Sequence, residues 1–460
     1  MSVILKIKMH DKFRLELITV SHPQQKPLTF DLFWFFPKEL DVTQSSYPKP
    51  LFYRYLKNNM RYRIPDQTLT ELTAPDNRYI KILVDEIINE NDLEYHHALR
   101  LLSNIFVKAL KKEINVHTAN EKTEDILQAN IQVKAVLRRL RAQITISGQG
   151  NKFGFQTVNQ YCSSEVIQTY LACIADIPDG QIKNALLKTV AEENEYRHAN
   201  KMSALDNNAS FIKSVRKLKL IRRYCEGTLF LKTRRSEEGV VAQQIIFSLA
   251  AALSMMFAML IAFWSQQKFG NFTTSFLAAM VLGYIVKDRL KELSREVTYL
   301  RLSRYLFDFS TQLQSERLLR KPTIGTIKEV VQFIKPRKLD NTLRNFYQQQ
   351  ANYSKDSYES VLMYRRQFKT STKIMPKGID QYVNFTLFNL RKMLRNASYQ
   401  DYPFFYQKGS KVICRMVQKS YPIELVARIT GDGEARYQHY TLTVTRKGIR
   451  RIHQASFNDN

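Results

Sequence analysis

The sequence predicts an α+β protein that a helical hairpin in the middle of the chain anchors in a membrane. Residues 245–264 run for twenty positions without a charge, which at helical rise spans about 30 Å, the thickness of a bilayer's hydrocarbon core. A second apolar stretch, 272–286, follows a short polar break. Apolar and polar residues alternate, as in strands, at the beginning of the chain and again near its end. These observations predict a transmembrane hairpin at 240–286 between two cytosolic parts.

The composition favours folded domains on either side of the hairpin, located in a reducing compartment. The 460 residues are 44% hydrophobic, which is ample for folded cores. Four cysteines are spread along the chain without a C-x-x-C pair, a pattern that argues against a disulfide framework and against a clustered zinc site. The only apolar run near the start is Val3–Leu5, which is too short for a signal-peptide core. The soluble parts are therefore expected in the cytosol.

The first 205 residues are expected to form one cytosolic α+β domain. Apolar and polar residues alternate across 1–36, which predicts a β-meander of three strands. From residue 79 the apolar period changes to that of helices, so 79–205 is predicted to be helical.

Residues 206–239 are predicted to hold a basic amphipathic helix beside the membrane. Its apolar positions, such as Val215, Leu218 and Ile221, recur at helical spacing among many cations. An interfacial position, with cations at the lipid headgroups, is the functional interpretation, and a solvated helix packed on the amino-terminal domain is the alternative. The predicted lipid-binding residues are Lys213, Arg216, Lys217, Lys219, Arg222 and Arg223.

The charges around the hairpin predict its orientation. Nine basic residues and one acid lie between Lys213 and Arg235, whereas the loop 265–275 holds only Lys268. The positive-inside bias then places both termini in the cytoplasm of a multi-pass protein, in a bacterial inner membrane. Trp264 and Lys287 are the expected interface residues. The second apolar stretch is short for a full span, so the alternatives are a re-entrant segment, a single span or a buried helical hairpin.

The carboxy-terminal part is the basic part of the chain. Residues 287–460 carry 33 basic and 15 acidic side chains, which accounts for +18 of the total net charge of +28. Apolar spacing of four and three from Val286 to Leu300 predicts a juxtamembrane helix over 287–334. The domain 335–460 is predicted to contain strands at 402–407, 411–418, 423–429 and 435–445.

The sequence contains no catalytic signature, and no catalytic residue, metal site or cofactor is predicted. Two Glu-x-x-His pairs, Glu94/His97 and Glu195/His198, have the spacing that di-iron bundles use. The separate glutamate helices that such a site needs are not convincingly present, so these four residues remain weak candidates. The spans contain no charge that would mark an ion path.

The predicted function is a membrane-tethered, non-enzymatic scaffold, sensor or effector that acts through protein and anionic-lipid contacts. Its partners are membrane lipids, an unidentified protein and further copies of the chain. Nucleic acid is the second choice, because aromatic residues and cations interleave at Tyr402, Phe404, Phe405, Tyr406 and Lys408. Further alternatives are a small oligomeric pore-forming effector and a di-iron oxidase.

Overall fold

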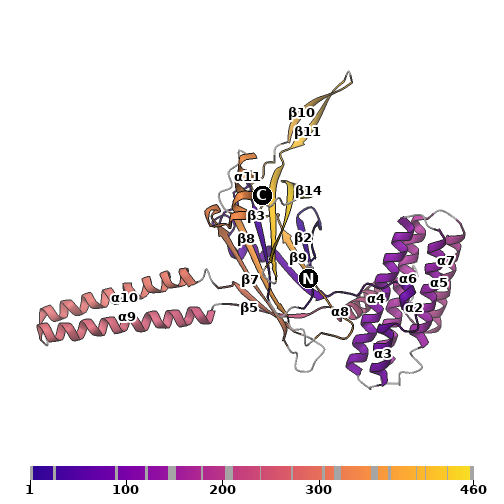
Figure 1. Cartoon of the computed structure of the whole chain (residues 1–460), viewed down its shortest axis with the longest axis horizontal. Helices are drawn as coiled ribbons and strands as arrows, with labels where there is room; N and C mark the ends of the chain where they lie inside the picture. The colour runs from indigo at the N-terminus through magenta and orange to yellow at the C-terminus, as the bar shows by residue number, and fades with distance from the viewer. Residues whose placement is uncertain are drawn as a thin grey trace.

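The protein has a mixed α+β fold in which two helical insertions leave a β body (Figure 1). We describe it from a computed structural model. The described residues are 4–23, 27–88, 92–119, 123–142, 152–177, 180–202, 211–238, 240–270, 273–302, 306–314, 323–353, 361–370, 375–399, 401–409, 411–431 and 434–455.

The larger sheet of the β body has eight antiparallel strands drawn from both ends of the chain. Their order is β14-β13-β12-β3-β8-β7-β6-β5. The near-continuous apolar run of β3 suits a central strand with both faces covered. The strands are β3 (Leu28–Phe35), β5 (Lys232–Glu237), β6 (Phe309–Gln314), β7 (Thr323–Ile334), β8 (Val361–Thr370), β12 (Tyr421–Gly431), β13 (Glu434–Thr445) and β14 (Gly448–Ala455).

The smaller sheet has four strands in the order β1-β2-β9-β4. The hairpin of β1 and β2 was expected, but the predicted three-stranded meander is wrong: β3 leaves it to pair with β8 and β12. Strands of the predicted domains 1–205 and 335–460 thus share both sheets. The strands are β1 (Ile4–Met9), β2 (Arg14–Ser21), β4 (Leu56–Tyr62) and β9 (Tyr382–Asn389).

The first insertion is a helical bundle between β4 and β5. Its two ends meet, because the Tyr62 amide donates to the Leu229 carbonyl (2.8 Å). Within the predicted helical region 79–205, the described residues form helices up to Ala199. The helices are α2 (Leu69–Thr73), α3 (Arg78–Ile88), α4 (Asp92–Ala119), α5 (Thr123–Ala142), α6 (Lys152–Asp176), α7 (Gln181–Ala199) and α8 (Phe211–Gly227).

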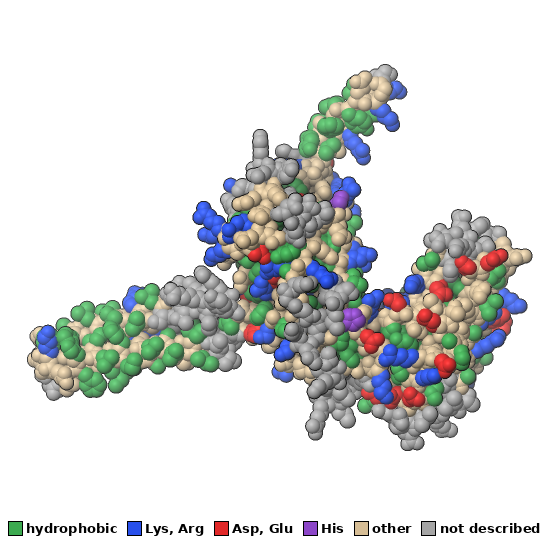
Figure 2. Space-filling view, viewed as in Figure 1, with side chains coloured by type: hydrophobic (Ala, Val, Ile, Leu, Met, Phe, Trp, Pro, Cys, Tyr) green, Lys and Arg blue, Asp and Glu red, His purple; other side chains and the backbone are tan. Residues whose placement is uncertain are grey.

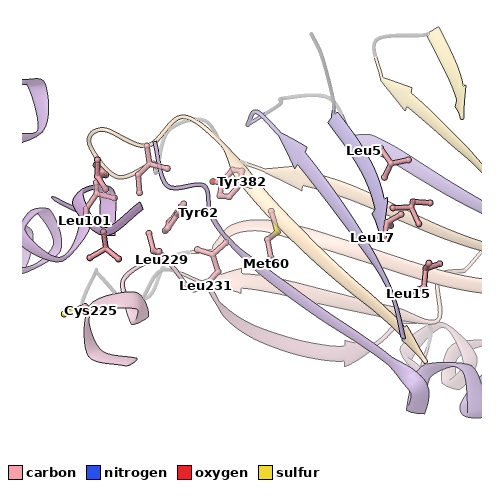
Figure 3. Packing of buried hydrophobic residues seen from close by; sticks show 14 of the residues in the cluster. Leu5, Leu15, Leu17, Met60, Tyr62, Leu101, Cys225, Leu229, Leu231 and Tyr382 are labelled. Carbon is pink, nitrogen blue, oxygen red and sulfur yellow. The ribbon is translucent and has the colours of Figure 1, made fainter. Parts of the chain in front are cut away.

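One hydrophobic core runs from the sheets into the bundle (Figure 3). Tyr62 and Tyr382 stack with ring centroids 5.6 Å apart at the junction. Leu229 and Leu231 come from the chain that returns from the bundle, and Leu101 lies on α4. The bundle is therefore packed onto the β body and does not hang from it by linkers alone.

The second insertion is the pair of helices α9 (Val240–Phe269) and α10 (Thr274–Leu302), between β5 and β6. The pair projects from the β body (Figure 1). The predicted helix over 287–334 is wrong beyond Leu302, because β6 and β7 follow. Alternation and β-branched residues in β7 (TIGTIKEVVQFI) favour a strand there.

A two-stranded ribbon, β10 (Asp401–Lys408) and β11 (Lys411–Gln418), projects from another part of the β body (Figure 1). The four predicted strands between 402 and 445 are confirmed as β10 to β13. Two further helices pack on the β body: α1 (Lys49–Tyr55) and α11 (Asn341–Tyr353).

Candidate membrane anchor and binding surfaces

The surface of α9 and of the first half of α10 is apolar. Within the described residues, α9 is the one helix long and apolar enough to cross a membrane, over Gln244–Phe269 with a mean hydropathy of 2.4. Large apolar side chains on both helices point outward (Figure 2). Leu249 on α9, for example, is 59% exposed. Soluble monomers rarely expose apolar patches of this extent.

Small residues fill the contact between the two helices. Ala250, Ser254 and Ser265 are the buried residues of α9 between Gln244 and Phe269, and Ser254 is 2% exposed. On α10, a Cβ added to Gly283 would lie 3.1 Å from Cγ2 of Ile261, so glycine permits the close approach. Small residues inside and large apolar residues outside are the arrangement of membrane helices, and a water-soluble helix pair shows the reverse. The spacing of Ala250 and Ser254 was a signal available in the sequence.

The register of the pair places the charges of α10 beside the apolar part of α9. Because the helices are antiparallel and Gly283 faces Ile261, Lys287 lies about one turn further toward the base of the hairpin. Its ammonium lies 3.9 Å from the ring centroid of Tyr284. Only the outer halves, about 18 Å long, are therefore apolar in both helices. The predicted interface residue Trp264 is exposed within this outer part.

The base of the hairpin is held by Asp308, which precedes β6. Its carboxylate accepts hydrogen bonds from Lys49 Nζ (2.7 Å), the Tyr53 hydroxyl (2.9 Å) and the Val331 amide (2.9 Å). Burial, followed by the neighbouring Asp308 charge, raises the pKa of Tyr53. Arg235 of β5 lies with its guanidinium carbon 3.7 Å from the Phe309 ring centroid. The hairpin thus leaves the β body beside a carboxylate with three hydrogen-bond donors.

Helix α8 carries the predicted lipid-binding residues on its outer surface. Its apolar residues Ile221 and Cys225 are buried against the bundle, and Arg222 donates to Glu165 of α6 (2.9 Å). All six cations are exposed, Arg222 together with Lys213, Arg216, Lys217, Lys219 and Arg223. Figure 1 shows α8 on the side of the β body that faces away from the hairpin. Lipid contact by this basic face stays a prediction.

The two Glu-x-x-His pairs lie on helices that are separated by α6, since α4 and α7 each pack against it. Glu195 and His198 are exposed, and Glu94 is half-buried. His97 is 7% exposed and therefore lies inside the bundle. Among the residues that the structure describes, no three His, Cys, Asp or Glu side chains gather as metal ligands would.

His97 should make the bundle sensitive to acid. Burial, followed by the charge of Arg100, lowers the pKa of His97 from 6.5 to about 4. The fold favours the neutral ring, so its stabilising contribution is complete above pH 6.5 and is lost as the pH falls toward 4. The difference corresponds to about 3 kcal/mol. We expect His97→Gln to flatten the loss of melting temperature between pH 7 and pH 4.5. The control His198→Gln should retain the wild-type slope, and equal slopes in all three proteins would contradict the assignment.

The β10–β11 ribbon presents different chemistry on its two faces. One face interleaves Tyr402, Phe404 and Tyr406 with Arg415, Lys408 and Lys411, because Phe404 pairs with Arg415 and Lys408 with Lys411. The other face carries Phe405, Val412 and Met416. All of these side chains are exposed to solvent. The aromatic and basic residues predicted from the sequence are thus brought onto one ribbon, with Phe405 on its other face.

Comparison with known proteins supplies no family for these features. No protein-family model, no curated protein and no solved structure matches this chain. The apolar hairpin, the basic face of α8 and the aromatic ribbon therefore have to be interpreted from their own chemistry.

Proposed function

We propose that the chain is a membrane-anchored, non-enzymatic sensor or effector whose α9–α10 hairpin inserts in a bilayer. The observation that carries the proposal is the distribution of residues on the hairpin, with large apolar side chains outside and Ser254 and Gly283 inside. In water this arrangement exposes a large apolar surface, whereas in lipid the same surface is solvated and the small residues pack.

The same-side position of both hairpin ends supports cytoplasmic termini. β5 and β6 pair with each other, so the chain enters and leaves the hairpin at one sheet edge. Cations flank this edge at Arg234 and Arg235, and Lys287 begins the charged half of α10. The positive-inside bias then favours tip-first insertion from the cytoplasmic side of a bacterial inner membrane, in a multi-pass or re-entrant arrangement. The proposed lipid partners are anionic.

Membrane fractionation tests the proposal. The full chain should sediment with membranes, resist extraction by alkaline carbonate and dissolve in detergent. Release by carbonate would mean that the hairpin contacts the membrane only at its surface, and recovery as a soluble monomer would overturn the proposal.

A second candidate function is single-strand nucleic-acid binding by the β10–β11 ribbon. Alternate residues on one strand face are about 7 Å apart, so Tyr402, Phe404 and Tyr406 offer a row of rings on which successive unstacked bases are able to stack. Arg415, Lys408 and Lys411 lie on the same face to neutralise phosphates. Tyr402, Phe404 and Tyr406 are all exposed, which leaves the rings on this face open.

The ribbon variant Tyr402→Ala/Phe404→Ala/Tyr406→Ala should weaken binding of an oligothymidylate at least tenfold, since each stacked base contributes about 1–3 kcal/mol. Fluorescence anisotropy of the detergent-solubilised chain measures this at low salt. Phe405→Ala, on the opposite face, is the matched control and should bind as the wild type does. Absence of binding by the wild type at low salt would remove this candidate.

A further inference from the structure

A groove lies where the edge strand of the small sheet faces the strands at the base of the hairpin. Its volume is about 680 Å³, within the range typical of sites for small ligands. One wall is β4 with Phe385 and Leu387 of β9, the other is formed by β5, β6 and β7, and Arg366 of β8 closes it. We call it the inter-sheet groove.

Cations outnumber carboxylates in the inter-sheet groove. Its charged lining consists of Lys57, Arg61, Arg235 and Arg366 against Glu16 and Glu329. Both carboxylates are already engaged. Glu16 pairs with Lys8 (2.9 Å), and Glu329 accepts a hydrogen bond from the Tyr364 hydroxyl (2.5 Å) and lies 3.6 Å from Arg235. The groove therefore offers an excess of positive charge.

Arg366 is a buried cation with an unused donor. The residue is 2% exposed, and its Nη1 donates to the Thr386 hydroxyl (3.0 Å). Its Nε lies 3.3 Å from Glu329 but makes no hydrogen bond within the described residues. Nearby, Asn384 donates to the same hydroxyl (3.1 Å), and its buried Oδ1 has no partner in the described part of the chain. A buried guanidinium with an unsatisfied donor destabilises the fold unless another group accepts a hydrogen bond from it.

Arg61 is a half-buried cation that no carboxylate pairs. Its guanidinium carbon lies 4.6 Å from the centroid of the Phe385 ring, and the described residues give it neither an ion pair nor a hydrogen bond. Burial lowers the pKa of Arg61, while Glu226 and Glu16 act in the opposite direction. Its donors are thus available to a ligand lying against Phe385.

We propose that the inter-sheet groove binds a small phosphate-bearing anion of about mononucleotide size. Arginine forks match the oxygen geometry of phosphate and form paired, charge-assisted hydrogen bonds with it. Phe230 and Phe385 supply apolar surface for the remainder of the ligand. A second hollow, of about 550 Å³, shares Phe230 and is lined by Lys219, Arg222, Arg223 and Lys232, so the basic surface extends toward α8.

The location of the groove links it to the membrane hairpin. Arg235 and Thr233 belong to β5 and Thr311 to β6, and these strands lead directly into and out of α9 and α10. A bound anion contacts the strands that hold the hairpin. The binding proposal stands without the membrane proposal, because the groove is built entirely by the β body and the segment that follows α8.

Binding by the detergent-solubilised full chain tests the proposal. The probes are inorganic phosphate, each of the four common ribonucleoside 5′-monophosphates, and dihexanoyl phosphatidic acid, with the corresponding nucleosides as uncharged controls. Titration calorimetry should give a Kd below about 1 mM for at least one phosphate probe and no heat for the nucleosides. Tightest binding of a nucleotide identifies a nucleotide site, and tightest binding of phosphatidic acid identifies a lipid headgroup.

The substitution Arg61→Gln should weaken this binding at least tenfold, and Arg235→Gln should act in the same direction. Arg63→Gln is the matched control, because Arg63 lies two residues away, outside the groove, and pairs with Asp66 (3.0 Å). Binding of no phosphate probe, or equal binding by Arg61→Gln and wild type, would overturn the proposal. The same titration of a chain without α9 and α10 should give an unchanged Kd, which separates failure of the groove from failure of the anchor.

Discussion

Replacing Gly239–Phe307 with an Asn-Gly turn should move the protein from the membrane fraction to the supernatant with its β body intact. β5 and β6 pair along their whole length, and the Glu238 amide donates to the Asp308 carbonyl (3.3 Å) where the strands meet the helices. Asn-Gly fits the two-residue turn that connects such antiparallel strands. The hairpin is therefore removable without breaking the sheet.

The expected change is large because the apolar surface of α9 is by itself sufficient to drive transfer of the chain from water into the membrane. Its exposed side chains include Leu249, Met256 and Leu260, and transfer of each from water contributes about 1.5–3 kcal/mol. Over the helix the sum is on the order of 20 kcal/mol, so the full chain should reside wholly in membranes and the replaced chain wholly in the supernatant.

Sedimentation after cell lysis measures the change of fraction, and circular dichroism of the supernatant measures whether the β body stays folded. Lys268→Gln, a change at the hairpin tip, should leave the protein in the membrane fraction. Persistent membrane association of the replaced chain would place the anchor elsewhere, for which the β10–β11 ribbon is the first candidate. Dye leakage from vesicles that contain the full chain would favour the oligomeric pore, in which the charged half of α10 faces water.

The parts of the fold that the sequence predicts are those set by local patterns. The uncharged run 245–264 predicts a helix and the alternation around Phe404 and Cys414 predicts strands, each within its own segment. Both appear as expected, in α9 and in the ribbon. The heptad-like spacing from Val286 to Leu300 was a true helical signal that ended sooner than predicted, because β7 has strand character of its own.

The inter-sheet groove was invisible to sequence reasoning. Its residues come from strands that are distant in the chain, so no motif spacing connects Arg61, Arg235 and Arg366. The position of β3 was hidden for the same reason. Its continuous apolar run indicates a covered strand, but nothing local specifies β8 and β12 as its neighbours.

Asp31 pairs with a cation on each of the two strands that flank β3. It is 1% exposed in the centre of the eight-stranded sheet, directly opposite Arg365 on one side and Arg428 on the other. Its Oδ1 accepts from Arg365 Nε (2.7 Å), and its Oδ2 accepts from Arg428 Nη2 (2.5 Å). The carboxylate thus bridges one cation on β8 and one on β12, the two strands that flank β3.

Removing this carboxylate should destabilise the β body strongly. Asp31→Ala leaves Arg365 and Arg428 facing a cavity without their common anion, and breaking a buried ion pair from one side costs about 3–5 kcal/mol. Both arginines retain partial exposure, so we expect a value near 3 kcal/mol. Urea unfolding of the soluble, hairpin-replaced chain measures it as a lower midpoint with an unchanged slope.

A double-mutant cycle separates the ion pair from the loss of packing. Because Asp31→Ala and Arg365→Ala each break the same contact, the loss of stability in the double variant should be smaller than the sum of the two single losses. Asp76→Ala is the control, since Asp76 and Lys81 form an exposed pair (2.7 Å) and such pairs contribute little. If Asp31→Ala unfolded at the wild-type midpoint, or if the two single effects were additive, β3 would owe its place to the apolar faces of the strand and not to the shared carboxylate.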